Sequence, residues 1–352
     1  MPKALPLLLS AALILCSCVT SGPNAVRRET GAYNRSIVDT QNRQLLLNLV
    51  RHKYRDVPYF LGVNSITSSK STGFSAKFGG SVSTANEGAG FGFEHNDGPT
   101  ISYAPLQGED FLKSVLAPIP AESLLVLMQS GWSSERVLGM CAERINGLDN
   151  ASSASGPTPT YVPRYREFQR AMELLRQLQL NDEIFAGEEE GEVYIEIAAD
   201  ALGTAEVKEL QQLLNVPPNI TTFRLTHDFR GARQDQLAIR TRSISSILFF
   251  LSHNVETPEP HAEQGLTTIT KTRSGEAFDW DQLSGDFLRV HTSQTPPTKA
   301  FVSVPYRGWW FYIKDNDLNS KSTFLLLTQL FNLQAGQNHS VSPTLTIPVR
   351  GG

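Results

Sequence analysis

Apolar residues alternate with small or polar residues along residues 72–94, and this period of two predicts two β-strands. The intervening Asn86-Glu87-Gly88 predicts a turn. Five apolar positions mark one face of the pattern: Phe74, Phe78, Val82, Phe91 and Phe93. We therefore expect a glycine-rich β-hairpin whose arms approach the roughly 9–11 residues that a membrane-spanning strand needs.

Helical spacing of apolar residues dominates much of the remaining chain. Residues 37–52 predict an N-terminal helix, and residues 163–180 predict a long amphipathic one. Further helices are expected at 109–116, 121–128, 134–146, 204–214, 243–251 and 319–333. Short strands are expected at 99–103, 193–197, 221–225, 236–240, 287–291, 300–304, 309–313 and 344–349. Because these elements alternate irregularly, the prediction is an α+β fold with a mixed or antiparallel sheet and packed helices, plus the N-terminal helix and the hairpin.

The segment 149–160 is rich in Ser, Ala, Gly and Pro, which is typical of a linker. It would separate a helical region at 36–148, which contains the hairpin at about 72–94, from an α+β domain at 161–352. Residues 18–35 are polar and predict a flexible N-terminal tether.

The first residues resemble an export signal. Lys3 precedes a twelve-residue apolar stretch at 4–15, which is too short to span a bilayer. Leu15, Ser17 and Cys18 then resemble the lipobox of bacterial lipoproteins. We expect residues 1–17 to be a signal peptide and Cys18 to carry diacylglycerol and palmitate. An ordinary cleaved signal followed by an unanchored protein is the alternative.

The residue after Cys18 is Val19 rather than Asp, the usual signal for retention in the inner membrane. By resemblance to lipoprotein sorting in Gram-negative bacteria, this favours the periplasmic face of the outer membrane over the inner membrane. Acyl chains on Cys18 would be sufficient for stable anchoring in the lipid bilayer. The only cysteine beyond this region is Cys141, in an apolar helical context that predicts a buried, inert thiol.

The charge of the chain and the motifs it lacks exclude several classes of function. A formal net charge of −4 gives no basic footprint for nucleic acid. Phosphate-binding loops and the common hydrolase and metal-binding motifs are absent from the sequence, so no catalytic residue, metal ligand or cofactor is predicted. An enzyme remains an alternative if His227 or His253 meets a carboxylate in a cleft formed by distant residues.

An aromatic run, Trp309-Trp310-Phe311-Tyr312, falls on a predicted strand. Alternation places Trp309 and Phe311 on one face and Trp310 and Tyr312 on the other. A central strand covered on both faces explains this pattern. The alternative is an exposed surface that stacks on a glycan or a protein partner.

Four segments resemble a family of uncharacterised lipoproteins from Gram-negative bacteria: 45–51, 54–58, 129–132 and 310–320. The resemblance implies the envelope location but no activity and no site residues.

These patterns predict a membrane-anchored envelope lipoprotein that acts in structure or assembly, or binds other envelope proteins or itself, without catalysis. Two alternatives remain: a hydrolase-like periplasmic enzyme, and an oligomeric pore-forming lipoprotein that uses the hairpin.

Overall fold

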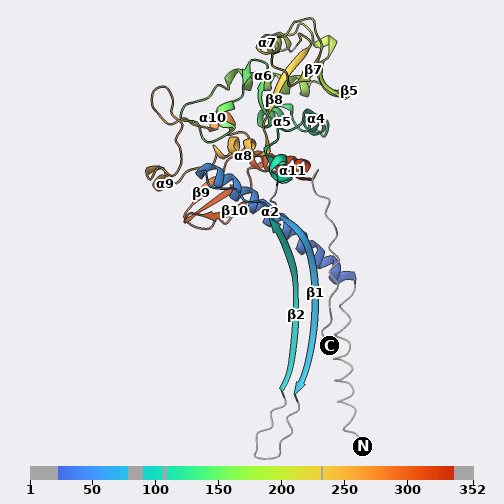
Figure 1. Cartoon of the computed structure of the whole chain (residues 1–352), viewed down its shortest axis with the longest axis vertical. Coiled ribbons are helices and arrows are strands. Elements are labelled where there is room, and N and C mark those ends of the chain that lie inside the picture. The colour runs from blue at the N-terminus through green and yellow to red at the C-terminus, as the bar shows by residue number, and fades with distance from the viewer. Residues whose placement is uncertain (1–22, 78–89, 106–108, 231–232, 337–352) are drawn as a thin grey trace, which may run out of the picture. The chain divides into compact units, whose positions relative to one another are not determined.

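Two sheets organise the fold in the computed structural model, which describes residues 23–77, 90–105, 109–230 and 233–336. One is a mixed six-stranded sheet and the other a small three-stranded antiparallel sheet, which confirms the predicted α+β class. The chain divides into two compact units. One contains α2 (Pro23–Tyr54) and the elements from α3 (Glu109–Leu116) to α11 (Leu318–Gly336); the other contains β1 (Leu61–Lys77) and β2 (Gly90–Pro105) (Figure 1).

The N-terminal helix α2 confirms the helix predicted at 37–52 and extends it to 32 residues, or about 48 Å. It begins at Pro23, a residue that is well tolerated in the first turn of a helix. The flexible tether predicted for 18–35 is therefore wrong from Pro23 onward, because polar residues are equally compatible with a solvent-exposed helix. Arg51, His52 and Lys53 lie in the last turn, where positive charge favours the helix dipole.

The large sheet joins segments from both sides of the predicted linker. Its strand order is β4 (Leu148–Asp149), β3 (Ala142–Ile145), β8 (Gln236–Thr241), β7 (Thr222–Thr226), β6 (Glu192–Ile197) and β5 (Ile184–Glu189). All neighbours are antiparallel except β7 and β8, which are parallel. Because β3 pairs with β8, residues 149–160 do not separate two domains, and the predicted boundary is wrong.

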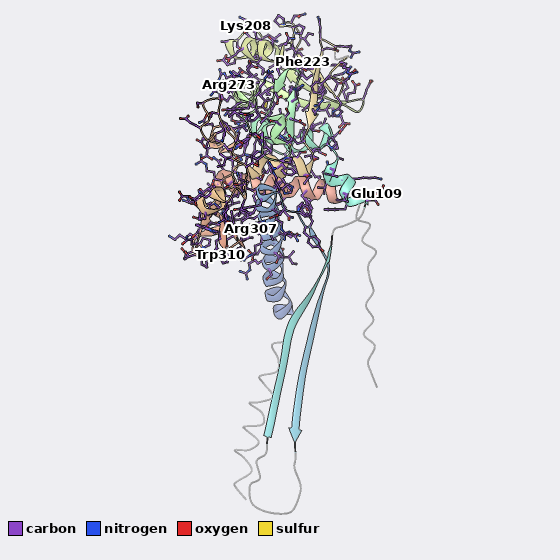
Figure 2. All side chains as sticks on the ribbon, turned by 60° about the vertical axis from the view of Figure 1, so that its left-hand side comes forward. Glu109, Lys208, Phe223, Arg273, Arg307 and Trp310 are labelled. Atoms are coloured by element: carbon purple, nitrogen blue, oxygen red, sulfur yellow. The ribbon has the colours of Figure 1, made fainter. Side chains whose placement is uncertain are left out.

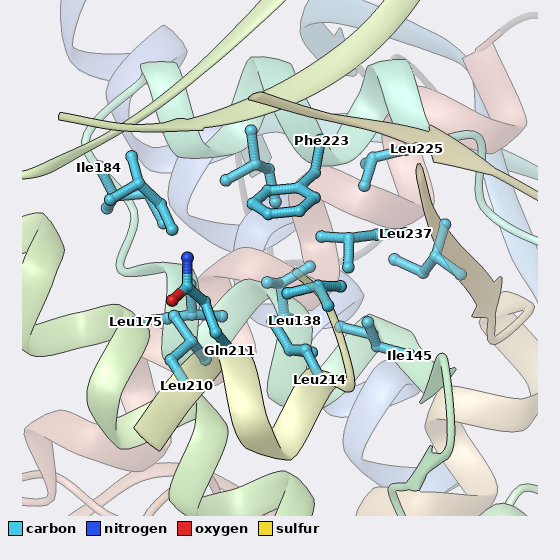
Figure 3. A pocket seen from close by; sticks show the side chains of 14 residues that line it. Leu138, Ile145, Leu175, Ile184, Leu210, Gln211, Leu214, Phe223, Leu225 and Leu237 are labelled. Carbon is cyan, nitrogen blue, oxygen red and sulfur yellow. The ribbon is translucent and has the colours of Figure 1, made fainter. Parts of the chain in front are cut away.

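Among the helices that pack apolar side chains against this sheet are α5 (Ser134–Cys141), α6 (Arg166–Leu180) and α7 (Ala205–Leu214). Figure 3 shows Leu138, Leu175 and Leu214 facing Phe223 and other side chains of the strands. A cavity of only about 20 Å³ remains among them. This is about the space of one water molecule, so the region is a packed core rather than a ligand site.

The small sheet has the order β10 (Ala300–Tyr306), β11 (Trp309–Lys314) and β9 (His291–Ser293). Its buried face packs on α2, where the rings of Tyr54 and Phe311 lie 6.1 Å apart. Helix α8 (Ile244–Ser252) also contacts α2, and the His52 and Phe249 rings meet edge to face at 4.5 Å. The remaining helices are α4 (Ala121–Gln129), α9 (Glu259–Glu263), α10 (Asp281–Ser284) and the 3₁₀ turns η1 (Ser152–Ala154) and η2 (Ala199–Ala201).

Most predicted elements occur with shifts of a few residues at their ends. The strand expected at 99–103 is the last part of β2, and β5 was not predicted. The strand expected at 287–291 begins only at His291, and the strand expected at 344–349 lies outside the described residues. In the described part of the chain, no helix has both the length and the apolar character needed to cross a membrane.

The helix expected at 134–146 ends at Cys141, and the chain continues as β3. Arg242 provides the reason for this early end. Its side chain is 1% exposed and donates hydrogen bonds to the carbonyl oxygens of Gly139 at 3.3 Å and of Met140 at 2.9 Å. These carbonyls lie in the last turn of α5, where helical partners are missing. A guanidinium therefore caps α5 and allows the next residues to pair with β8.

Arg242 holds the segment after β4 as well. It donates to the Ala142 carbonyl at 2.9 Å, to the Asn150 carbonyl, and to Ser155 Oγ at 3.0 Å. Its guanidinium also lies 4.0 Å from the centre of the Phe250 ring. The predicted linker is thus part of the core, and its small residues allow close approach to this buried cation.

Replacing Arg242 by Met should lower the free energy of unfolding by about 3–5 kcal/mol, because several buried carbonyls would lose their donor. Urea denaturation measures this change. The control is Arg240→Met, which removes an exposed arginine two residues earlier, on β8. Arg240→Met should cost less than about 1 kcal/mol. Equal stability of the two variants would show that Arg242 does not organise the fold.

Candidate functional site

The β1–β2 hairpin is the first candidate site, and it is longer than the predicted 72–94. Its strands have 17 and 16 residues, so β1 extends about 56 Å. They pair from Leu61 opposite Pro105 to Lys77 opposite Gly90, with one irregularity between Val63 and Ser65. Phe78, Val82 and the predicted turn lie outside the described residues.

The register of the hairpin divides its residues between two unlike faces. Near the turn, one face holds Phe74 opposite Phe93 and Ala76 opposite Phe91. The other face holds Ser75 opposite Gly92, and glycine recurs along it. The register therefore places Phe74, Phe91 and Phe93 on one face.

The apolar face is not continuous along the hairpin. Farther from the turn, the same face holds Thr72 opposite His95 and Lys70 opposite Asp97. Apolar pairs return at Ile66 opposite Ile101. Along this face, the apolar pairs at Phe74 and Ala76 are thus followed by polar pairs at Thr72 and Lys70.

The aromatic strand β11 is the second candidate site. Its four aromatic residues, 309–312, differ in how exposed they are. Phe311 is fully buried with Val304 on the face toward α2, which fits the interpretation of a covered strand and excludes Phe311 from the alternative partner surface. Trp309 is half-buried on the same side, with its ring 6.3 Å from that of His261. This face of β11 is therefore part of the hydrophobic core of the unit.

Trp310 and Tyr312 lie on the opposite face of the small sheet and are half-exposed. The neighbouring strands place the exposed Pro305 and half-exposed Ser293 opposite Trp310. The rings of Tyr312 and His291 lie 5.6 Å apart. Figure 2 shows Trp310 at the end of this unit remote from Lys208. This face presents partly accessible aromatic rings that could contact a partner.

A polar network at the end of α2 fixes the β10–β11 hairpin. Arg307 and Gly308 form its turn with φ values of 48° and 82°, the left-handed conformation that two-residue hairpin turns require. Tyr306 donates to the Asp56 carboxylate, and Arg307 donates to the same oxygen at 2.8 Å. Burial raises the pKa of Asp56, but these hydrogen bonds and the Arg307 charge outweigh it and hold the pKa below its ordinary value.

Beside this network, Tyr54 Oη lies 2.7 Å from His261 Nδ1. Burial raises the pKa of Tyr54 to about 12 and lowers the pKa of His261. Both groups are therefore neutral at pH 7, and Tyr54 can donate to the imidazole. This pair joins α2 to α9.

Among the described residues, neither of the two histidines named by the enzyme alternative contacts a carboxylate. His227 Nδ1 lies 3.1 Å from the Ile239 carbonyl. His253 contacts the Ala154 carbonyl at 3.1 Å and Thr158 Oγ1 at 3.3 Å, and its ring stacks on Trp280 at 4.2 Å. Burial lowers the pKa of His253 to about 3. Both histidines therefore hold the fold together rather than forming the predicted pair.

A histidine–carboxylate pair occurs elsewhere, between His291 Nδ1 and Glu256 Oε1 at 2.6 Å. The second Glu256 oxygen accepts from the Thr292 backbone N–H at 2.8 Å, which fixes the start of β9. No spacing signal could have predicted this pair, because its members are 35 residues apart.

Two further groups of reactive type are buried. Cys141 is 0% exposed, and burial raises the pKa of its thiol to about 12, in agreement with the inert thiol predicted. Lys53 is 7% exposed and donates one hydrogen bond, to the His253 carbonyl at 3.2 Å. Burial lowers the pKa of Lys53 to about 8. Lys53 is therefore charged at neutral pH at a cost in stability.

Replacing Lys53 by Met should raise the free energy of unfolding at pH 7. Met has a similar shape to Lys but carries no charge, so the cost of the buried charge is removed. In the original protein, the folded-state pKa of about 8 lies below the ordinary 10.5. Between these values the unfolded chain binds more protons, so stability rises with pH there, by an amount on the order of 3 kcal/mol.

The advantage of Lys53→Met over the original protein should accordingly shrink between pH 8 and pH 10.5. Urea denaturation across this pH range measures the difference in free energy of unfolding between the variant and the original protein. Lys208→Met, which replaces an exposed lysine, is the control. A difference that does not vary with pH would contradict the depressed pKa.

Comparison with known proteins gives no relative from which a function could be transferred. No protein-family model, no curated protein and no solved structure matches the chain. The resemblance of four segments to a lipoprotein family stays a prediction.

Proposed function

We propose that the chain is a lipid-anchored component of the bacterial outer membrane that assembles through its β1–β2 hairpin, with copies of itself or with other envelope proteins. The long hairpin with two unlike faces carries this proposal. The lipobox at Cys18 supports the anchor and the envelope location. Catalysis, a metal and a cofactor have no part in this function.

The physical argument starts from the outer edges of the hairpin. Within the described residues, β1 and β2 pair only with each other, so each strand has one edge without strand partners. An isolated two-stranded ribbon is marginally stable in water, and unpaired edges readily accept another strand. Strands from neighbouring molecules would satisfy both edges. A length of about 56 Å gives many backbone groups for this pairing.

The second candidate function is an oligomeric pore, which the register of the hairpin favours. A strand that separates lipid from water needs apolar residues on one face and small or polar residues on the other. Phe74, Ala76, Phe91 and Phe93 meet this requirement on one face, and Ser75 and Gly92 on the other. Several copies, each donating one hairpin, would then line an aqueous passage.

Replacing Phe74 by Glu should reduce the native mass of the protein extracted in mild detergent, because it places a charge on the apolar face. The control, Ser75→Glu, introduces the same charge at the neighbouring residue, on the opposite face. It should leave the assembly intact. Native mass spectrometry or light scattering measures both variants beside the original protein.

A monomeric original protein, purified without partners, would overturn assembly with itself. Equal effects of Phe74→Glu and Ser75→Glu would contradict the division into faces. A ring of many copies that also conducts ions across planar bilayers would favour the pore over a purely structural assembly.

Replacing Cys18 by Ala should release the protein from the membrane fraction, because the thiol that accepts the lipid is lost. Fractionation of cells with immunodetection measures this change. Cys141→Ala is the matched control, since it removes the buried cysteine and leaves the lipobox unchanged. Continued residence of Cys18→Ala in the membrane would contradict the lipid anchor.

A further inference from the structure

A wide polar groove lies in the unit that contains α2 and α3 to α11, and it shares no residue with either candidate site. It has a volume of about 1130 Å³ and lies between the segment that leads into α6 and the loop before α10. Typical pockets for small molecules measure about 300–1,000 Å³, so this groove has room for an elongated ligand. Its walls carry both signs of charge and several aromatic rings.

The cations of the groove are unpaired. Arg164, Arg166, Lys271 and Arg273 all line it and are exposed. Among the residues that the structure describes, none of the four side chains makes an ion pair or a hydrogen bond. Their charges therefore remain available to an anionic ligand. Guanidinium groups suit carboxylate or phosphate especially well, because they can donate two parallel hydrogen bonds.

The acids of the groove are mostly engaged. Asp149 pairs with Arg144 at 3.2 Å and accepts from the Ser152 backbone at 2.8 Å. Asp279 accepts from the Asp281 backbone N–H at 3.0 Å, and Glu276 accepts from Ser274 Oγ at 3.3 Å. The charge of Asp149 is thus balanced by an arginine that does not line the groove. The four cations then face three other carboxylates, those of Glu167, Glu276 and Asp279, which leaves a small excess of positive charge for an anion.

An aromatic platform occupies the same groove. Tyr161 is 69% exposed, and its backbone is fixed beside Lys271. Lys271 N–H donates to the Thr160 carbonyl at 2.7 Å, and Val162 N–H donates to the Lys271 carbonyl at 3.3 Å. The rings of Tyr165 and Phe278, which also line the groove, lie 6.1 Å apart. An exposed ring on a backbone held in this way can stack on the apolar face of a sugar.

We propose that this groove binds an anionic glycan, a chain of sugars that bear carboxylate or phosphate groups. The unpaired cations would bind the anionic groups, Tyr161 would stack on a sugar ring, and Glu167 and Gln282 would accept hydrogen bonds from sugar hydroxyl groups. An acidic peptide fits less well, because the carboxylates of the groove would repel it without hydroxyl groups to compensate. This inference is independent of the assembly proposed for the hairpin.

Calorimetric titration of the full chain in mild detergent tests the ligand class, with a short oligogalacturonate as the probe. The matched ligand is its methyl ester, which keeps the sugars and removes the charge. Oligoglutamate is the anion without sugars. We expect measurable binding of the oligogalacturonate that weakens with added salt, and at least about tenfold weaker binding of the other two.

Variants test the place of binding. Arg273→Glu should weaken oligogalacturonate binding at least about tenfold, because it reverses one of the four charges. Lys208→Glu makes the same change on α7, outside the groove, and should have no effect (Figure 2). Tyr161→Ala should weaken binding, whereas Tyr161→Phe should retain it because the ring persists.

Four results would overturn the proposal. They are no binding of the oligogalacturonate, equally tight binding of its methyl ester, equally tight binding of oligoglutamate, and equal effects of Arg273→Glu and Lys208→Glu. Equally tight oligoglutamate binding would assign the groove to acidic peptides instead.

Discussion

The hydrogen bonds of one buried guanidinium hold the main unit together. Arg242, directly after β8, ends α5, allows β3 to turn into the sheet, and holds the segment after β4 against the end of β8. Burial lowers the pKa of Arg242 to about 10, so the group is still charged at neutral pH. Charge-assisted hydrogen bonds to several carbonyls compensate for its desolvation. The topology of the large sheet therefore depends on a contact between residues about a hundred positions apart.

The same region contains further buried polar groups that are held by backbone atoms rather than by carboxylates. Lys53 and His253 are in direct contact, and the positive charge of Lys53 helps to keep His253 neutral. Burying such groups lowers the free energy of unfolding. Each of them can form its hydrogen bonds in few other arrangements, however, and this restricts how α2 can pack on α8. The reactive side chains that a sequence search would select are thus used for structure.

The surfaces available for binding differ in character. The hairpin offers backbone edges and an apolar band, which suit other strands or lipid. The outer face of the small sheet offers Trp310 and Tyr312, which suit a protein or a sugar ring. The groove offers charge and an exposed tyrosine. A lipid-anchored assembly protein that also contacts envelope glycans would use these surfaces together, each with its own ligand.

Local patterns in the sequence determined the fold class, most helices and the face that Phe74 shares with Phe93, because periodicity is a property of neighbouring residues. They could not show that the helix expected at 134–146 ends at Cys141, that 149–160 is core rather than linker, or that Trp310 and Tyr312 stay partly exposed while Phe311 is buried. The groove was also missed, since its cations come from two separate segments. Each of these features depends on contacts between distant residues, and only the tertiary structure decides which of those contacts form.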